Sequence, residues 1–448
     1  PAFPRSLRSS CHLHLLCLSL FSLPHSSPHF HARLSSPAVA RVRVRSASWS
    51  CRTHLPYPNC DLPYLPYSPT LPYAMASSQN RPIEANGTVF AVSSQNKYVI
   101  EELIGRGGFG EVYKVCLQRD RKMKYAMKTE QVGIPANCER LKIECVVYER
   151  LQLTAGNRQH FVHMVDSGIT DKNKFMVIEI VSHSIADVFN RMCRKDFAIH
   201  TVIEIARQTL RAIESLHEMG WLHRDIKPGN FSLGLPPNDK TIFMLDFGTA
   251  REFRDIHGRL RVPRVSVTTP KTFRYCSLRA HNNEEQSRRD DMESWLYMIL
   301  EFFEEKNISW RTTKAFKEIF LGKVHLLNEP VKLYNEDRLC VPVQFIHVIQ
   351  AIESMTYVDP VDYTGIREIL DIVVKDEEVD MKLPLDWIGK KMPEKPKVIP
   401  MVPPKDDKKK EKNEADKAAA REEAKEAKRD KKIAEMLIRE YEDCGIRL

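Results

Sequence analysis

The sequence predicts an α+β fold in which short strands come first and long helices follow. Two observations carry this prediction. Four apolar segments early in the chain have the length and composition of strands, namely 98–100, 112–115, 125–128 and 175–178. Two later segments, 200–219 and 291–303, are long and apolar enough for buried helices. In 200–219 the apolar residues fall on one helical stripe, as a core helix requires.

A glycine-rich stretch lies between the first two strands. Gly105, Gly107 and Gly110 fit the pattern G-x-G-x-x-G, and glycines let the backbone approach phosphate groups closely. Dinucleotide-binding folds also use this pattern, but there it leads from a strand into a helix, with an acidic residue about 20 residues later. Strand-like residues stand on both sides here, which favours a hairpin flap that closes over ATP.

The strand at 125–128 ends in a lysine, Lys128. In a nucleotide-phosphate site such a lysine grips the phosphates and pairs with a glutamate on the following helix. Two glutamates compete for this role. Glu144 lies near the same helical face as the apolar Tyr148, so it points inward, whereas Glu149 is one residue further along and turns away. We therefore favour Glu144, and a surface ion pair remains the alternative for either residue.

The segment 223–230 reads H-R-D-I-K-P-G-N and carries the strongest chemical signal. Asp225 can accept a proton from a substrate hydroxyl, Lys227 can neutralise charge on a moving phosphoryl group, and Asn230 can hold a metal ion. Phosphoryl transfer needs mainly positioning and electrostatics, so this small set at this spacing is diagnostic. A chance loop match is the alternative, and the order of the other motifs argues against it.

A second acidic motif follows the apolar strand that starts at Phe243. Asp246 begins the triplet D-F-G, sixteen residues after Asn230. The strand delivers the Asp246 carboxylate to the site, where it can bridge Mg²⁺ to phosphates. Phe247 should pack inward, and Gly248 provides the turn.

With these motifs in place, the chain resembles the eukaryotic protein kinases over roughly residues 96–391. Within that superfamily it is similar to the casein kinase one family and, closest, to its tau-tubulin kinase branch. The segments that carry the narrower resemblance are H-R-D-I-K-P-G-N-F at 223–231, R-Y-C-S at 274–277 with His281, Q-S-R-R-D-D-M-E-S-W at 286–295, A-R-E-F at 250–253 and I-A-D-V at 185–188.

The resemblance implies a bilobal fold that uses ATP and Mg²⁺. The small lobe, 96–181, would be a five-stranded antiparallel sheet with one helix, and the large lobe, 182–391, would be mainly helical. Asp225, Lys227 and Asn230 would be catalytic, and Asn230 and Asp246 would bind the metal. The residues expected around ATP are Ile104, Gly105, Gly107, Gly110, Val112, Ala126, Lys128, Glu144, Glu179, Val181 and Asp246. Val112 and Ala126 would sandwich adenine, and the backbone from Glu179 to Val181 would bond to it.

The resemblance also implies the substrate class. Lys227 is typical of kinases that phosphorylate Ser or Thr hydroxyls of proteins. One departure is Lys271, which stands where relatives carry a glycine and leaves the shape of the substrate shelf open. A basic patch could select acidic or primed substrates, with ordinary solvated charge as the equal alternative; its candidates are Arg264, Lys271, Arg274, Arg288 and Arg289.

Two other functions stay open at this point. One is a pseudokinase scaffold that binds partners without transferring phosphate, and the other is an ATP-binding regulatory module. Retention of every catalytic group argues against the scaffold, while the Lys271 departure and the unusual tail keep it as the alternative.

Composition limits the function classes. The net charge is +9, of which residues 1–74 contribute +6, so the remaining chain is nearly balanced and nucleic-acid binding is not implied. The eleven cysteines form no C-x-x-C pair, which indicates reduced thiols. No apolar run approaches the roughly 18–20 residues that span a bilayer. We expect a cytoplasmic or nuclear monomer without membrane association.

The two ends of the chain differ in composition from the middle. Residues 1–95 are expected to be disordered, and 1–74 could be a signal peptide, a transit peptide or translated upstream sequence with the start at Met75. We favour the last, because the composition changes at Met75. The segment 392–448 reads as a Pro-rich linker and a charged helical tail. The tail could bind a partner, although a charged helix without a specific role is the stronger expectation.

Overall fold

The computed structural model of the chain describes residues 83–91, 96–107, 110–134, 139–153, 158–255, 257–264, 267, 273–304, 308–331 and 341–393. Several sequence predictions lie outside these residues. They concern the segment 1–74 with its start at Met75, the residue Lys271, and the tail from 394 onward.

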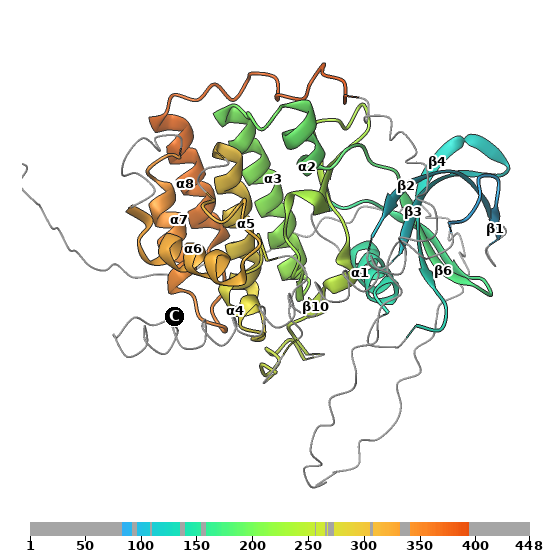
Figure 1. Cartoon of the computed structure of the whole chain (residues 1–448), viewed down its shortest axis with the longest axis horizontal. Coiled ribbons are helices and arrows are strands. Elements are labelled where there is room, and N and C mark those ends of the chain that lie inside the picture. The colour runs from blue at the N-terminus through green and yellow to red at the C-terminus, as the bar shows by residue number, and fades with distance from the viewer. Residues whose placement is uncertain are drawn as a thin grey trace, which may run out of the picture. The chain divides into compact units, whose positions relative to one another are not determined.

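Six strands form one antiparallel sheet in the first part of the chain (Figure 1). Across the sheet they follow the order β1-β2-β3-β4-β6-β5. Their bounds are β1 Val89–Ala91, β2 Lys97–Arg106, β3 Glu111–Leu117, β4 Asp120–Gln131, β5 Met164–Ile169 and β6 Asn173–Glu179. One helix, α1 (Leu141–Leu153), packs against β4, β5 and β6. This is the predicted small lobe, with one strand more than expected.

The additional strand is β1, and it corrects the prediction that residues up to 95 are disordered. Its three residues pair with β2 in the register Val89 to Val99 and Ala91 to Lys97. Phe90 between them is 3% exposed, and its ring meets the Phe175 ring edge-on at 5.3 Å. Three residues are too few to show a period of two in the sequence, so only the pairing shows this strand.

The second part of the chain is mainly helical. Its longer helices are α3 (Ile199–Glu218), α5 (Arg288–Phe303), α6 (Phe316–Asn328), α7 (Phe345–Ser354) and α8 (Tyr363–Asp376). Its short helical elements are α2 (Ile185–Asp187), the π-helical turn η2 (Val188–Met192), α4 (Leu278–His281) and the 3₁₀ turns η3 (Pro228–Asn230) and η4 (Phe247–Thr249). Two pairs of short strands complete it. They are β7 (Trp221–Leu222) with β10 (Arg251–Glu252), and β8 (Phe231–Leu233) with β9 (Ile242–Met244).

Helices α3 and α5 form the centre of the large lobe, and both were predicted from their apolar patterns. They lie side by side (Figure 1), and the buried Trp295 indole of α5 donates to the Thr209 hydroxyl of α3 at 2.9 Å. Helix α5 starts at Arg288, earlier than predicted, because Ser287 and Asp290 form a reciprocal capping box. The α+β, two-lobed prediction is therefore confirmed.

The last described segment closes on the large lobe. Trp387 is buried and its indole N–H donates to the Asp239 carbonyl at 2.9 Å. Among the described residues, no helix is both long and apolar enough to cross a bilayer.

Strand β1 provides a test of the small lobe's extent. Phe90→Ala should destabilise the protein by about 3 kcal/mol, because it removes a buried ring from the sheet core. The matched change Val89→Ala, on the same strand at a side chain 45% exposed, should cost less than ~0.5 kcal/mol. Denaturant unfolding of both variants measures the difference, and equal stabilities would exclude a packed β1.

Candidate active site

A cavity of about 660 Å³ lies between the sheet and the helical lobe. Its walls come from both lobes. The predicted site residues that line it are Ile104, Gly105, Gly107, Gly110, Val112, Ala126, Lys128, Glu144, Val181, Asp225, Lys227, Asn230 and Asp246. Residues spread over 143 positions of sequence therefore meet in one place, as the motifs predicted.

Glu179 is the exception among the predicted ATP-binding residues. It ends β6, and its backbone N–H donates to the His163 carbonyl at 3.0 Å. Its exposed carboxylate accepts from the His163 backbone N–H at 2.9 Å. Glu179 thus faces β5 and a neighbouring cavity, while Ile180 and Val181 line the main one. The sequence prediction for Glu179 concerned its backbone, so the outward position of the carboxylate leaves that backbone contact to adenine a prediction.

The glycines form the predicted hairpin between β2 and β3. The Gly107 N–H donates to the Gly110 carbonyl at 2.9 Å, and the strand on each side excludes the strand-to-helix geometry of a dinucleotide site. A Cβ on Gly110 would stand 1.8 Å from the Thr129 carbonyl oxygen, so packing alone requires this glycine. A Cβ on Gly107 would meet nothing closer than 3.9 Å. Its small size leaves space for a ligand.

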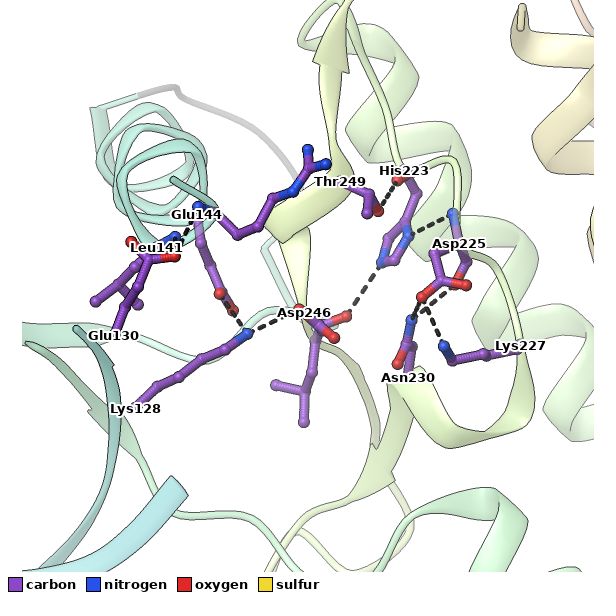
Figure 2. Close-up of polar contacts among 12 residues, drawn as sticks. Lys128, Glu130, Leu141, Glu144, His223, Asp225, Lys227, Asn230, Asp246 and Thr249 are labelled. Carbon is purple, nitrogen blue, oxygen red and sulfur yellow. Dashed lines mark hydrogen bonds and ion pairs between the residues drawn. The ribbon is translucent and has the colours of Figure 1, made fainter. Parts of the chain in front are cut away.

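Lys128 makes two ion pairs, and the one with Asp246 joins the two lobes (Figure 2). Its ammonium lies 2.6 Å from Glu144 Oε2 on α1 and 2.7 Å from Asp246 Oδ1. Burial lowers the pKa of Lys128, but the two carboxylates outweigh burial and hold that pKa above its ordinary value. Burial likewise raises the pKa of Asp246, and Lys128 more than offsets it, so the Asp246 carboxyl stays ionised.

Helix α1 places Glu144, and not Glu149, at this ion pair. Glu144 is 2% exposed, whereas Glu149 faces solvent. The start of α1 is fixed by Glu130 of β4, whose Oε1 accepts the backbone N–H groups of Arg140 at 2.8 Å and Leu141 at 3.3 Å (Figure 2). A carboxylate two residues after Lys128 thus satisfies free N–H groups at the helix N-terminus and anchors the helix that carries Glu144.

Asp225, Lys227 and Asn230 form a second polar group across the cavity. Lys227 Nζ lies 2.6 Å from Asp225 Oδ2. The Asn230 amide donates to the Asp225 backbone carbonyl at 2.7 Å and to its Oδ2 at 3.1 Å. These contacts hold the Asp225 side chain in one orientation, which a group that accepts a proton needs.

The residues before Asp225 are held by contacts that the sequence analysis did not single out. Asp291 of α5 accepts the backbone N–H of His223 at 2.7 Å and that of Arg224 at 2.8 Å. His217 lies 2.9 Å from the same carboxylate. Burial raises the pKa of Asp291, but His217 and His223 offset this and bring it below its ordinary value. Arg224, at φ 64°, sits in a left-handed conformation that this anchoring stabilises.

Asp246 and Asn230 present oxygen atoms that suit Mg²⁺. The Asn230 amide nitrogen is committed to Asp225, so its Oδ1 is available to a metal. One Asp246 oxygen accepts from Lys128, and the side chain remains 44% exposed in the cavity. The two predicted metal ligands therefore fit the ion that accompanies nucleotide phosphates.

Phe247 packs inward, as predicted. Its ring lies edge-on to the Tyr148 ring of α1 at 5.2 Å and 5.4 Å from the His223 ring. The His223 imidazole lies 3.1 Å from the Leu245 carbonyl. This stack connects α1 to the loop that carries Asp225 through the residue next to Asp246.

The predicted basic patch is largely used for structure. Arg288 and Arg289 are buried, and Arg274 donates to the Arg311 carbonyl at 2.8 Å. A different cluster contains Arg264. Arg251 and Arg264 both pair with Glu285, and burial with these two neighbouring cations lowers the pKa of Arg224 to about 10. Two guanidinium groups thus share the Glu285 carboxylate, and Arg224, next to Asp225, lies close enough for their charges to lower its pKa. These three residues are defined here as the arginine cluster: Arg224, Arg251 and Arg264.

Comparison with known proteins agrees with this geometry. A family model for the protein kinase domain matches residues 98–371. The serine/threonine-protein kinase spe-6 of Caenorhabditis elegans is 34% identical over 299 residues, which are 66% of this chain and 76% of that protein. A second C. elegans protein, ZK507.1, carries a provisional serine/threonine-protein kinase name and is 31% identical over 278 residues, 62% of this chain and 82% of that protein.

The Lys128 ion pair gives the site's first test. Glu144→Gln should lower kcat/KM for ATP about 30-fold, a loss of about 2 kcal/mol, because it leaves a buried ammonium without one of its charged partners. Glu149→Gln removes the same charge from the exposed face of the same helix and should leave kcat/KM within about twofold. Steady-state kinetics at varied ATP decides, and equal effects of the two changes would refute the assignment.

Proposed function

The chain belongs to the protein kinase family, and on this premise we propose that it is an active serine/threonine kinase that transfers the γ-phosphoryl group of ATP to Ser or Thr hydroxyls of proteins. One observation carries the proposal. The charged groups that such a transfer needs lie in one cavity, with Lys128 paired to Glu144 and Asp246 on one side and Asp225 held by Lys227 and Asn230 on the other.

The chemistry follows from the position of each group. Asp225 accepts the proton of the attacking hydroxyl, and Lys227 neutralises charge on the phosphoryl group as it moves. Lys128 binds the ATP phosphates, and the glycine hairpin covers them. Mg²⁺, held by Asn230 and Asp246, would neutralise phosphate charge. Val112 and Ala126 line the apolar end of the cavity, where the adenine ring fits.

The alternatives are a pseudokinase scaffold and an ATP-binding regulatory module. A scaffold needs neither an oriented base nor an intact lysine–glutamate pair. An ATP-binding module would use Lys128 but has no need of an oriented base, so the contacts of Asp225 support the active enzyme over both.

Within the kinases we place the chain in the casein kinase one family, nearest the tau-tubulin kinase branch. The support is the sequence R-Y-C-S at 274–277 and Q-S-R-R-D-D at 286–291. The arginine cluster supports a preference for acidic or already phosphorylated substrates, because two of its guanidinium groups share a single carboxylate, that of Glu285. We also propose a monomer in the cytoplasm or nucleus, which fits the free thiols of Cys116, Cys145, Cys193 and Cys276.

Asp225→Asn tests the proposed reaction. We expect kcat for phosphate transfer to casein to fall about 10²- to 10⁴-fold, the usual contribution of a general base, while ATP binding persists. Transfer of labelled phosphate measures the first and calorimetric titration the second. A wild-type protein that is folded and binds ATP, yet transfers no more phosphate than the variant, would favour the scaffold.

Arg251→Gln tests the substrate preference. KM for an acidic or phosphorylated peptide should rise about tenfold, or about 1.4 kcal/mol, the worth of one charge-assisted hydrogen bond, and KM for a neutral peptide should stay unchanged. Arg259→Gln is the control, since Arg259 lies in the same segment with its side chain 74% exposed. A parallel rise of both KM values for Arg251→Gln would contradict a selective role.

A further inference from the structure

The segment from Phe273 to Ser277, called the substrate shelf here, borders the catalytic side of the cavity. Tyr275 and Cys276 line the same cavity as Asp225. No helix or strand includes these residues. The proposed function places the acceptor peptide beside Asp225, so the shelf must hold its shape without the support of regular secondary structure.

Side chains from outside the shelf donate hydrogen bonds to its backbone carbonyls. Lys323 of α6 donates to the Phe273 carbonyl at 2.5 Å and also to the Cys276 carbonyl. The indole N–H of Trp310 donates to the Arg274 carbonyl at 2.9 Å. Three of the five shelf carbonyls are therefore fixed by two side chains that lie 36 to 50 residues further along the chain.

Lys323 is an unusual residue for this task because its side chain is fully buried, at 0% exposure. Lysine is almost never buried unless its charge is compensated. Its ammonium lies 5.1 Å from the Tyr297 ring and 5.8 Å from the Trp310 ring, within cation–π distance. Burial also lowers its pKa below the ordinary value. Because burying this charge is costly, we expect Lys323 to have a specific structural role.

The hydrogen bonds of Lys323 indicate what that role is. An ammonium has three donors. Two go to the shelf carbonyls, and the third faces Nε2 of His281 at 3.1 Å. Burial and the nearby Lys323 keep the pKa of His281 well below its ordinary value, so the ring is neutral. The same Nε2 lies 3.3 Å from the Phe273 carbonyl. The ammonium of Lys323 thus contacts two shelf carbonyls and a ring just after the shelf.

We propose that Lys323 is a positioning residue for the protein substrate. It fixes the shelf from Phe273 to Cys276 in the shape that presents the acceptor hydroxyl to Asp225. Lys323 itself touches neither nucleotide nor substrate. This inference rests on the proposed kinase function and assigns a part of the site that ATP does not use. Loss of Lys323 should consequently affect the peptide and spare the nucleotide.

Lys323→Met tests the proposal, since it keeps the length of the side chain and removes the three donors. We expect KM for a peptide substrate to rise at least about tenfold, because the partly buried Phe273 and Cys276 carbonyls lose the Lys323 ammonium, with KM for ATP within about twofold of wild type. Lys317→Met removes a lysine from the same helix at a half-buried position and should leave both KM values unchanged.

A second variant covers the case in which Lys323→Met does not fold. Trp310→Phe keeps an aromatic ring and removes only the donor to the Arg274 carbonyl, so it should raise the peptide KM in the same direction and speed tryptic cleavage after Arg274. If the folded variants keep the wild-type peptide KM and cleavage rate, Lys323 has only a structural role and the proposal fails. If wild-type protein transfers no phosphate, the kinase function fails instead, and the cleavage rates alone decide whether Lys323 holds the shelf.

Discussion

The carboxylate of Asp291 is the contact on which the active site depends. It lies within the buried helix α5 and accepts the backbone N–H groups of His223 and Arg224, 68 and 67 residues earlier in the chain. A buried carboxylate is costly unless its lone pairs are used, and here His217 uses them as well. The catalytic loop is therefore attached to the central helix α5 of the large lobe. This attachment restricts the movement of Asp225.

The ion pair of Lys128 with Asp246 connects the small lobe to the large lobe, in which this loop is anchored. Lys128 reaches both Glu144 on α1 and Asp246 after β9, so one ammonium sets the distance between the lobes. Glu130 adds a second constraint, because it fixes the start of α1 from the strand that carries Lys128. The same device recurs at the substrate shelf, where Lys323 organises backbone that has no regular hydrogen bonding of its own. Buried charges thus hold the loop before Asp225, the start of α1 and the substrate shelf.

Sequence alone could predict the parts that depend on local spacing. The glycine hairpin, the loop around Asp225 and the choice of Glu144 over Glu149 all follow from short-range geometry, and the structure places them as predicted. Long-range partners were beyond reach, because nothing in the spacing of Asp291 or Lys323 reveals which backbone groups they meet. Strand β1 was too short to show a period, and nothing in the sequence around Arg288 and Arg289 shows that they are buried. Charge can be counted in a sequence, but exposure cannot.

The Asp291 anchor can be tested directly with Asp291→Asn, compared with Asp290→Asn, which alters the cap at the start of the same helix and its bond to the Ser277 hydroxyl. The measurement is kcat for phosphate transfer together with the Kd for ATP. If Asp291 holds the catalytic loop, its variant should lose about 10²-fold in kcat, the cost of a displacement of about 1 Å at the reacting groups, and keep its ATP affinity. Asp290→Asn should lower the unfolding temperature and leave kcat within about threefold. A folded Asp291→Asn protein with wild-type kcat would contradict the account.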